Sequence, residues 1–197
     1  MILLIGGPSS AGKTNMAQKL LERYHIPYLS LDHLKMGIYR SNRNCGYTPL
    51  DSEEKIAEKL WPIVKEMIKT MIENEQNQII EGCYLLPELV EELMLEYPDD
   101  ILPVYLIFVE DYIFTHFDSH ILTYRSVIEN RGEEEDRPVS YFIHEHNKLK
   151  EKCIAYQSYY VEIKNNYEAE IEAVYEYIEG NLSNRDLTQV FYKNRRM

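Results

Sequence analysis

Residues 7–14, near the start of the chain, have the types and spacing of a phosphate-binding loop. They read Gly-Pro-Ser-Ser-Ala-Gly-Lys-Thr and fit the pattern of glycine, four residues, then Gly-Lys-Ser/Thr. Glycine at both ends lets the backbone adopt positive φ angles and come close to an anion. The N–H groups of the loop then point at phosphate oxygens. The loop residues expected to bind phosphate in this way are Gly7, Ser9, Ser10, Ala11 and Gly12.

Lys13 and Thr14 would add side chains to this backbone cradle. Lys13 is a mobile positive charge for the β- and γ-phosphates, and Thr14 offers a hydroxyl to Mg²⁺. The alternative is a glycine-rich turn that binds nothing. An apolar run over residues 1–5 precedes the loop and good helix formers follow it over residues 15–21. Strand, loop and helix are the setting that the motif requires, so the sequence favours nucleotide binding.

Two carboxylates follow apolar runs that we predict to be strands. Asp32 comes after residues 26–31, and Glu81 lies next to the end of the run at residues 78–82. In open α/β sheets the carboxyl edge of the strands is where ligands bind. Asp32 could also be a helix N-cap, and Glu81 could be an exposed residue at a strand end. The site interpretation makes Asp32 a partner of the acceptor, and lets Glu81 hold Mg²⁺ through water or orient the acceptor.

Arginines occur in two polar segments. Arg40 and Arg43 lie in a segment that we predict to be a loop over residues 39–49, where they could grip an anionic acceptor. Arg125, Arg131 and Arg137 surround an acidic tip, and a mobile segment with arginines can close over a transferring phosphate. The alternatives are solvated surface arginines in the first segment and a charged turn in the second.

The elements that must position these residues alternate along the chain. Apolar runs predict five strands, and amphipathic patterns between them predict helices, with a long one over residues 51–74. This alternation predicts a doubly wound parallel sheet with its site at the carboxyl edge. The expected strands cover residues 1–5, 26–31, 78–82, 101–109 and 159–163.

Composition narrows the classes of function. The net charge of −12 argues against a nucleic-acid surface, which needs a basic face. No apolar run reaches the length of a membrane span, and the first strand does not resemble a signal peptide. Cys45, Cys83 and Cys153 lack paired spacing, so we expect free thiols and a cytoplasmic location. His146 falls on an apolar helix face, which favours a core residue over a ligand.

These features together resemble the small P-loop kinases of the nucleoside-monophosphate-kinase type. The likeness covers about residues 1–180, and is carried by residues 6–14, Ser30-Leu31-Asp32 and residues 79–87. Within that group the chain looks closest to enzymes like 2-phosphoglycerate kinase, zeta toxin and antibiotic phosphotransferases. The resemblance implies a P-loop NTPase three-layer sandwich with strand order 2-3-1-4-5, a helical lid, and ATP with Mg²⁺ as cofactors.

The resemblance also implies roles for individual residues. Asp32 would orient or deprotonate an acceptor hydroxyl, Arg131 and Arg137 would be lid residues, and Asn165 would lie in the adenine-side loop. Arg125 would add to the charge near the nucleotide. Adenylate kinases carry an arginine shortly after strand three that contacts the acceptor phosphate, and the Glu-Gly-Cys-Tyr-Leu-Leu-Pro-Glu stretch of this chain has none. This departure weakens the case for a nucleoside monophosphate as acceptor.

The sequence therefore predicts an ATP- and Mg²⁺-dependent kinase that acts on a hydroxyl of a small molecule. The alternatives are a nucleoside monophosphate kinase and a nucleotide-binding regulator without turnover. We expect one kinase domain over residues 1–180, with an acceptor-side region at 33–76 and a lid at 125–138. A tail or a short docking helix would follow over residues 181–197.

Overall fold

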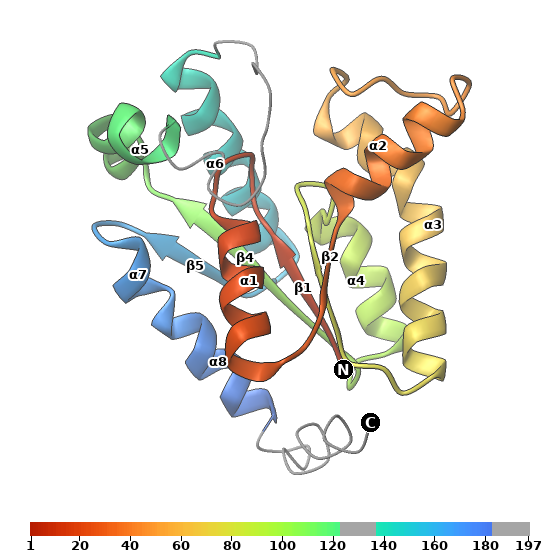
Figure 1. The fold of residues 1–197 in the computed structure, drawn as a ribbon. Coiled ribbons are helices and arrows are strands. Elements are labelled where there is room, and N and C mark those ends of the chain that lie inside the picture. The colour runs from red at the N-terminus through yellow and green to blue at the C-terminus, as the bar shows by residue number, and fades with distance from the viewer. Residues whose placement is uncertain (123–136, 183–197) are drawn as a thin grey trace.

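The fold is built on one parallel sheet. The structure, a computed structural model, describes residues 1–122 and 137–182. Five strands pair in the order β2-β3-β1-β4-β5, and all four pairs are parallel. This confirms the predicted fold class and strand order (Figure 1). The strands are β1 (Ile2–Gly6), β2 (Tyr28–Ser30), β3 (Gln78–Glu81), β4 (Ile101–Phe108) and β5 (Tyr160–Ile163).

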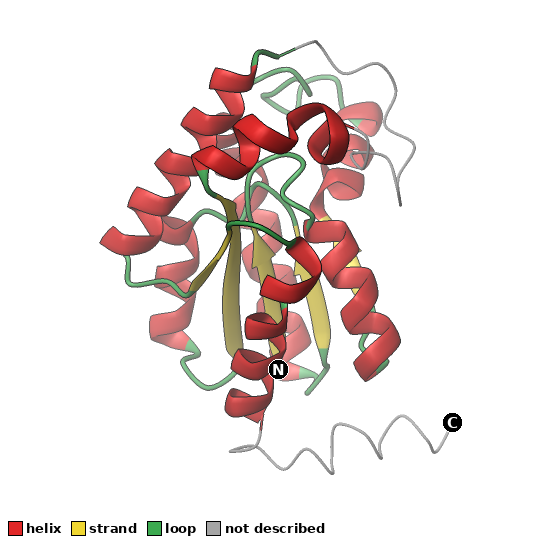
Figure 2. Ribbon diagram, turned by 90° about the vertical axis from the view of Figure 1, so that its left-hand side faces the viewer, coloured by secondary structure: helices red, strands yellow, loops and turns green. Residues whose placement is uncertain are grey.

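Helices connect the strands and cover both faces of the sheet (Figure 2). Each parallel connection needs such a crossover, because the chain must return to the same end of the sheet. A π-helical turn over Phe117–Leu122 follows α5. The helices are α1 (Lys13–Tyr24), α2 (Leu31–Ser41), α3 (Glu53–Glu73), α4 (Pro87–Glu96), α5 (Glu110–His116), α6 (Val139–Ala155), α7 (Tyr167–Glu170) and α8 (Glu172–Leu182).

Hydrophobic cores lie on both faces of the central strands. Every residue of β1 and β4 is buried, as expected for parallel strands covered on both faces. Leu3 and Ile5 pack into the core that holds the apolar faces of α1 and α8, whereas Ile2 and Leu4 pack into the core with α3 and α4. This alternation follows from the period of two in a strand, and it fixes which side chains at a strand end face α1.

Several predicted boundaries are corrected by the structure. Helix α2 continues to Ser41, so the loop predicted over residues 39–49 begins only at residue 42. The N-cap of α3 is Ser52, whose hydroxyl accepts a hydrogen bond from the Lys55 N–H. Asp51, where we expected the helix to begin, instead accepts a hydrogen bond from the Thr48 N–H at 2.6 Å. Ser52 is the cap because its short polar side chain lies nearest to the first free N–H groups of α3.

Other expectations concern cysteines and the membrane. All three cysteines are free, as predicted. Among the described residues, the structure contains no helix long and apolar enough to span a membrane.

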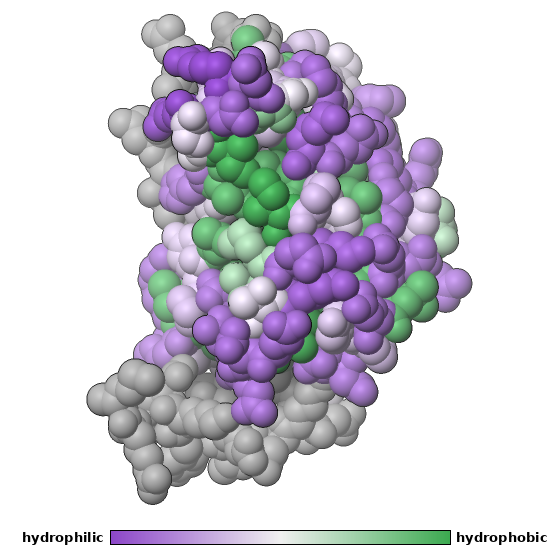
Figure 3. Space-filling model, turned by 90° about the vertical axis from the view of Figure 1, so that its right-hand side faces the viewer, coloured by the Kyte–Doolittle hydropathy of each residue, from purple (hydrophilic) through white to green (hydrophobic). Residues whose placement is uncertain are grey.

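The side of the molecule with α2 and α3 displays a band of hydrophobic residues bordered by hydrophilic ones (Figure 3). Trp61 of α3 is buried to 7% exposure, so it belongs to the core.

Candidate functional site

The glycine loop connects the end of β1 to the start of α1 with a strained backbone. Gly7 and Gly12 have φ angles of 151° and 82°, and Ser10 also has a positive φ of 64°. The Ala11 N–H closes a turn on the Pro8 carbonyl at 3.2 Å. A side chain on Gly7 would place its Cβ 2.8 Å from the Leu106 carbonyl oxygen. The two glycines therefore occupy positions where other residues would be strained, as the motif requires.

Lys13 lies at the mouth of this loop. Its ammonium donates a hydrogen bond to the Pro8 carbonyl at 2.7 Å, and the residue is only 3% exposed. Burial raises the pKa of the Cys83 thiol, which follows β3, and the nearby charge of Lys13 opposes this rise. Thr14 is partly buried in the first turn of α1. The motif side chains therefore gather where the ends of β1 and β3 meet the N-terminus of α1.

Tyr167, a residue that the sequence analysis did not select, packs against the same loop. The Tyr167 hydroxyl donates to the Gly12 carbonyl at 2.7 Å. A Cβ on Gly12 would lie 2.5 Å from the Tyr167 ring. The start of α7 thus fixes the loop from the side of β5. The sequence signal for this contact is weak, because Tyr167 and Gly12 are 155 residues apart.

Asp32 belongs to a three-residue cluster beside β3. It lies in the first turn of α2 but is not the N-cap, which is Ser30, so the capping alternative is wrong. Lys35 forms a 2.8 Å ion pair with Asp32, and the Tyr84 hydroxyl donates to the same carboxylate at 3.2 Å. Lys35 also donates to the Tyr84 oxygen at 2.8 Å. Two donors thereby fix the orientation of the Asp32 carboxylate.

Close packing brings these residues together. A Cβ on Gly82 would lie 2.8 Å from the Cβ of Leu31, so glycine lets the chain after β3 approach the start of α2. Burial raises the pKa of Tyr84 well above its ordinary value, with Cys83 and Asp32 contributing further. Tyr84 therefore stays a neutral phenol that donates a hydrogen bond. Sequence analysis missed Tyr84 and Lys35, although the spacing of Asp32 and Lys35 on a helix was a usable signal.

Glu81 is completely buried, so the alternative of an exposed strand end is wrong. In register it pairs with Ile5 on one side and with Ser30 on the other. Paired residues of parallel strands point to the same face, and Ile5 packs into the core with α1. Glu81 and Ser30 therefore face the side of the sheet that carries α1. In the described part of the chain, the buried Ser30 hydroxyl has no hydrogen-bond partner.

Glu53, in the first turn of α3, is a third carboxylate near the loop and was also missed. Its side chain is half-buried and lies near enough to Lys13 and Cys83 to interact with them electrostatically. Desolvation raises the pKa of Glu53 to about 7, against the attraction of Lys13. Burial also raises the pKa of Cys83, which keeps it a thiol. Glu53 and Cys83 are therefore both close enough to the loop lysine to feel its charge.

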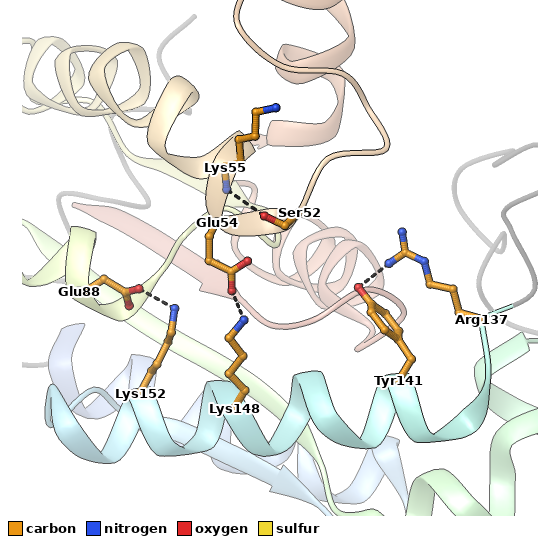
Figure 4. Close-up of polar contacts among 8 residues, drawn as sticks. All are labelled: Ser52, Glu54, Lys55, Glu88, Arg137, Tyr141, Lys148 and Lys152. Carbon is orange, nitrogen blue, oxygen red and sulfur yellow. Dashed lines mark hydrogen bonds and ion pairs between the residues drawn. The ribbon is translucent and has the colours of Figure 1, made fainter.

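Helix α6 crosses this region and is held to it by ion pairs (Figure 4). Lys148 pairs with Glu54 of α3, and Lys152 pairs with Glu88 of α4 at 2.6 Å. Arg137, just before α6, donates to the Tyr141 hydroxyl and lies 4.5 Å from the centre of its ring. Arg137 is therefore positioned at the α6 end of the segment that we predicted to be a lid.

His146 is a core residue, as the sequence predicted. It is 1% exposed, and its Nδ1 accepts a hydrogen bond from the Phe108 N–H at 2.9 Å. This contact assigns the ring proton to Nε2. Burial, reinforced by the charge of Lys13, lowers the pKa of His146 to about 3. His146 is therefore neutral, and it binds the backbone of Phe108, the last residue of β4.

Three of the remaining predicted residues, Arg40, Arg43 and Asn165, lie away from this cluster in the part of the chain that the structure describes. Arg40 is exposed, eight residues along α2 from Asp32, which is about 12 Å of helix rise. Arg43 is exposed and donates to the Tyr39 hydroxyl at 3.3 Å. Asn165 is exposed after β5, and its N–H donates to Glu170 at 3.2 Å. Arg125 and Arg131 lie outside the described residues.

Comparisons with known proteins show the fold. No protein-family model matches the chain, and no curated protein matches it either. Crystal structures of shikimate kinases are similar to it. The enzyme from Bacteroides thetaiotaomicron has a TM-score of 0.54 at 14% identity, over 91% of this chain and 98% of that chain. The enzyme from Acinetobacter baumannii, in complex with shikimate, has a TM-score of 0.52 at 16% identity, over 94% of each chain.

A shikimate kinase from Aquifex aeolicus gives a TM-score of 0.52 at 14% identity, over 92% of this chain and 98% of that chain. The chain therefore has a P-loop NTPase fold like that of shikimate kinases, in agreement with the expected fold. The narrower resemblance to 2-phosphoglycerate kinase, zeta toxin and antibiotic phosphotransferases is not confirmed by these structures.

Proposed function

We propose that the protein is a kinase that transfers the γ-phosphate of ATP, with Mg²⁺, to a hydroxyl of a small molecule. One observation carries this proposal: a loop with the phosphate-binding motif and carboxylates that could bind an acceptor lie at the same edge of the sheet. Lys13 lies in the loop after β1 with its ammonium on the Pro8 carbonyl, and Asp32 is held by Tyr84, which follows the neighbouring strand β3. A site for phosphoryl transfer needs both halves within reach of one another.

In this proposal the loop amides and Lys13 bind the β- and γ-phosphates. An acceptor oxygen forms a bond to the γ-phosphorus while the bond to the bridging oxygen of ADP breaks. Asp32 takes up the proton of the acceptor hydroxyl, and Lys35 with Tyr84 holds its carboxylate in position. Because the transition state places charge on the phosphoryl oxygens, Lys13 and lid arginines such as Arg131 and Arg137 would stabilise it.

A metal ion fits the α1 side of the sheet edge. The buried carboxylate of Glu81 and the Ser30 hydroxyl face that side, and Thr14 lies in the first turn of α1. Hard oxygen donors of this kind suit Mg²⁺. Thr14 would bind the ion directly, Glu81 would hold it through water, and the ion would neutralise charge on the phosphates. Asn165 and Arg125 remain candidates for the nucleotide side of the site.

The experiment that tests this function measures phosphate transfer from ATP to a broad panel of hydroxyl compounds. We expect Asp32→Asn to lower kcat by about 100-fold or more, with the KM for ATP little changed. A wild-type kcat in Asp32→Asn would contradict the role of Asp32. Turnover confined to nucleoside monophosphates would support the alternative of a nucleoside monophosphate kinase. ATP binding without turnover of any acceptor would support the alternative of a nucleotide-binding regulator.

A further inference from the structure

Tyr167 lies against the glycine loop, and the proposed mechanism leaves it without a role. It begins α7, shortly after β5, and its hydroxyl donates to the Gly12 carbonyl at 2.7 Å. The same carbonyl accepts the Met16 N–H at 2.9 Å, the first hydrogen bond of α1, of which Gly12 is the N-cap. Two donors therefore hold one carbonyl at the start of α1, one from its own helix and one from a segment 155 residues away.

The direction of this carbonyl fixes the direction of a neighbouring N–H group. Gly12 and Lys13 share one planar peptide group, and their peptide bond is trans. The C=O and the N–H of a trans peptide point in opposite directions. Because the Gly12 carbonyl points into α1 toward Met16, the Lys13 N–H points out of the helix N-terminus. N–H groups at this position cannot be satisfied within a helix and are the ones that bind phosphate in a glycine loop.

Glycine at position 12 makes this arrangement easy to lose. Its φ is 82°, and glycine changes its backbone angles at little steric cost. A rotation of the peptide between Gly12 and Lys13 would turn the N–H away from the loop. The Tyr167 ring comes within 2.5 Å of the position that a Cβ on Gly12 would take, and the Tyr167 hydroxyl adds a second bond to the carbonyl. Tyr167 therefore restrains a peptide that would otherwise depend on the first helical hydrogen bond.

The segment that carries Tyr167 is itself fixed. The Asn166 side chain caps α7, and the Glu170 carboxylate accepts the backbone N–H groups of Lys164 at 2.5 Å and Asn165 at 3.2 Å. The Tyr167 side chain packs against the core that holds α1. Burial raises the pKa of the Tyr167 phenol, so it keeps the proton that it donates. The hydroxyl thus reaches Gly12 from a rigid support.

We propose that Tyr167 is a positioning residue for phosphate binding, whose hydroxyl holds the Gly12 carbonyl so that the Lys13 N–H faces the phosphates of the nucleotide. The inference rests on the proposed function, because it requires the loop to bind nucleotide phosphates. Holding the peptide in place before binding removes the cost of ordering it on binding. Because Tyr167 contacts neither the nucleoside nor the acceptor in this proposal, its contribution is the same for every ligand that presents a polyphosphate to the loop.

The test measures two ligands on the full chain, Mg·ATP by calorimetry and inorganic tripolyphosphate with Mg²⁺ by competition against Mg·ATP. Tyr167→Phe keeps the ring and removes the hydroxyl. The matched control is Tyr159→Phe at the other end of β5, because the Tyr159 hydroxyl also donates to a backbone carbonyl, that of Ala173, at 3.2 Å. We expect Tyr167→Phe to weaken the binding of both ligands about fivefold, and Tyr159→Phe to change either by less than about twofold.

Steady-state kinetics separate this positioning role from a merely structural one. Tyr167→Phe should raise the KM for ATP about fivefold and leave the KM for the acceptor within about twofold of wild type. A general loosening of the fold would raise both values, and it would raise them in Tyr159→Phe as well.

The outcomes distinguish this inference from the proposed function. Wild-type affinity for Mg·ATP in Tyr167→Phe would overturn the inference and leave the kinase function standing. So would an equal loss in Tyr159→Phe, which would attribute the effect to stability. A loss for Mg·ATP without one for tripolyphosphate, or tripolyphosphate that does not compete with Mg·ATP, would overturn the inference because the nucleoside would then be the part that Tyr167 or the loop recognises. Failure of the wild type to bind Mg·ATP would overturn the proposed function and this inference with it.

Discussion

The two halves of the proposed site are built in different ways. The donor half is one continuous stretch, Gly7 to Thr14, whose shape comes from backbone angles and from the junction of β1 with α1. The acceptor half is assembled from side chains of separate elements, and its hydrogen bond between Tyr84 and Asp32 spans 52 residues. A backbone cradle suits the phosphates that all nucleotides share. A pocket made of side chains can change its acceptor without changing the fold.

This difference predicts different failures. A change in the donor half should act through backbone strain and remove nucleotide binding altogether. A change in the acceptor half should act through charge and hydrogen bonds, and leave nucleotide binding intact. The four predictions below run from the largest expected effect to the smallest.

Gly12→Ala should be the most damaging change. It adds a side chain at a φ of 82°, with its Cβ 2.5 Å from the Tyr167 ring. We expect the affinity for Mg·ATP to fall by about 100-fold or more and the free energy of unfolding to fall by roughly 2–4 kcal/mol. Calorimetry and urea denaturation measure the two effects.

The matched control is Gly37→Ala in α2, because a Cβ there has no neighbour within 4 Å. In a helix this change should stabilise the protein by about 0.5–1 kcal/mol and leave ATP binding unchanged. Equal ATP affinity in Gly12→Ala and wild type would contradict the description of the loop.

His146→Leu should destabilise the fold by roughly 2–3 kcal/mol at pH 8, because the buried Phe108 N–H loses its acceptor. The pKa of His146 is lowered to about 3 from 6.5, so its stabilising contribution is complete above pH 6.5 and declines as the pH falls toward 3. The penalty of the mutation should therefore shrink at pH 5. Urea denaturation at both pH values tests this, with the exposed His144→Leu as a control that should change little.

Glu53→Gln should make the protein more stable at high pH. The pKa of Glu53 is raised to about 7 from 4.5, so its contribution to stability is present below pH 4.5 and is lost as the pH rises through 7. After discounting for solvent screening, we expect the variant to exceed wild type by roughly 1–2 kcal/mol at pH 8 and to match it near pH 4.5. A variant that is less stable at pH 8 would show that burial of Glu53 is not costly.

Replacing Arg40 and Arg43 together by alanine should have the smallest effect. Both are exposed: Arg40 lies near the end of α2 distant from Asp32, and Arg43 follows that helix. We expect changes within about 0.5 kcal/mol in stability and within about twofold in the acceptor KM. A tenfold rise in that KM would restore the expectation that these arginines grip the acceptor.

The sequence predicted the sheet, and the glycine loop between a strand and a helix, because their signals are local. The loop motif is contiguous, and the apolar run of β4 directly indicates burial on both faces. Asp32 and Glu81 could be selected because strand ends meet at one edge of a parallel sheet. The structure gives the two carboxylates different surroundings: Asp32 lies in a polar cluster, whereas Glu81 has no exposed surface.

The acceptor half could be predicted only in part, because its contacts join distant segments. Nothing near Glu53 in the sequence shows that Cys83 and Lys13 approach it, and Tyr167 gives no local sign of packing on Gly12. Lys35 could have been predicted from its helical spacing relative to Asp32. The arginines at positions 40 and 43 had suitable chemistry, but the extent of α2 determined where they lie.

The most direct measurement is a calorimetric titration of Mg·ATP into full-length wild type, Lys13→Ala and the control Lys19→Ala. Lys19 lies on the same helix but pairs with Glu168 at 2.7 Å on the surface. We predict that wild type and Lys19→Ala bind Mg·ATP with similar affinity and that Lys13→Ala binds it at least about 100-fold more weakly. Equal binding by Lys13→Ala, or no binding by wild type, would contradict the assignment of this loop as the donor half of a kinase site.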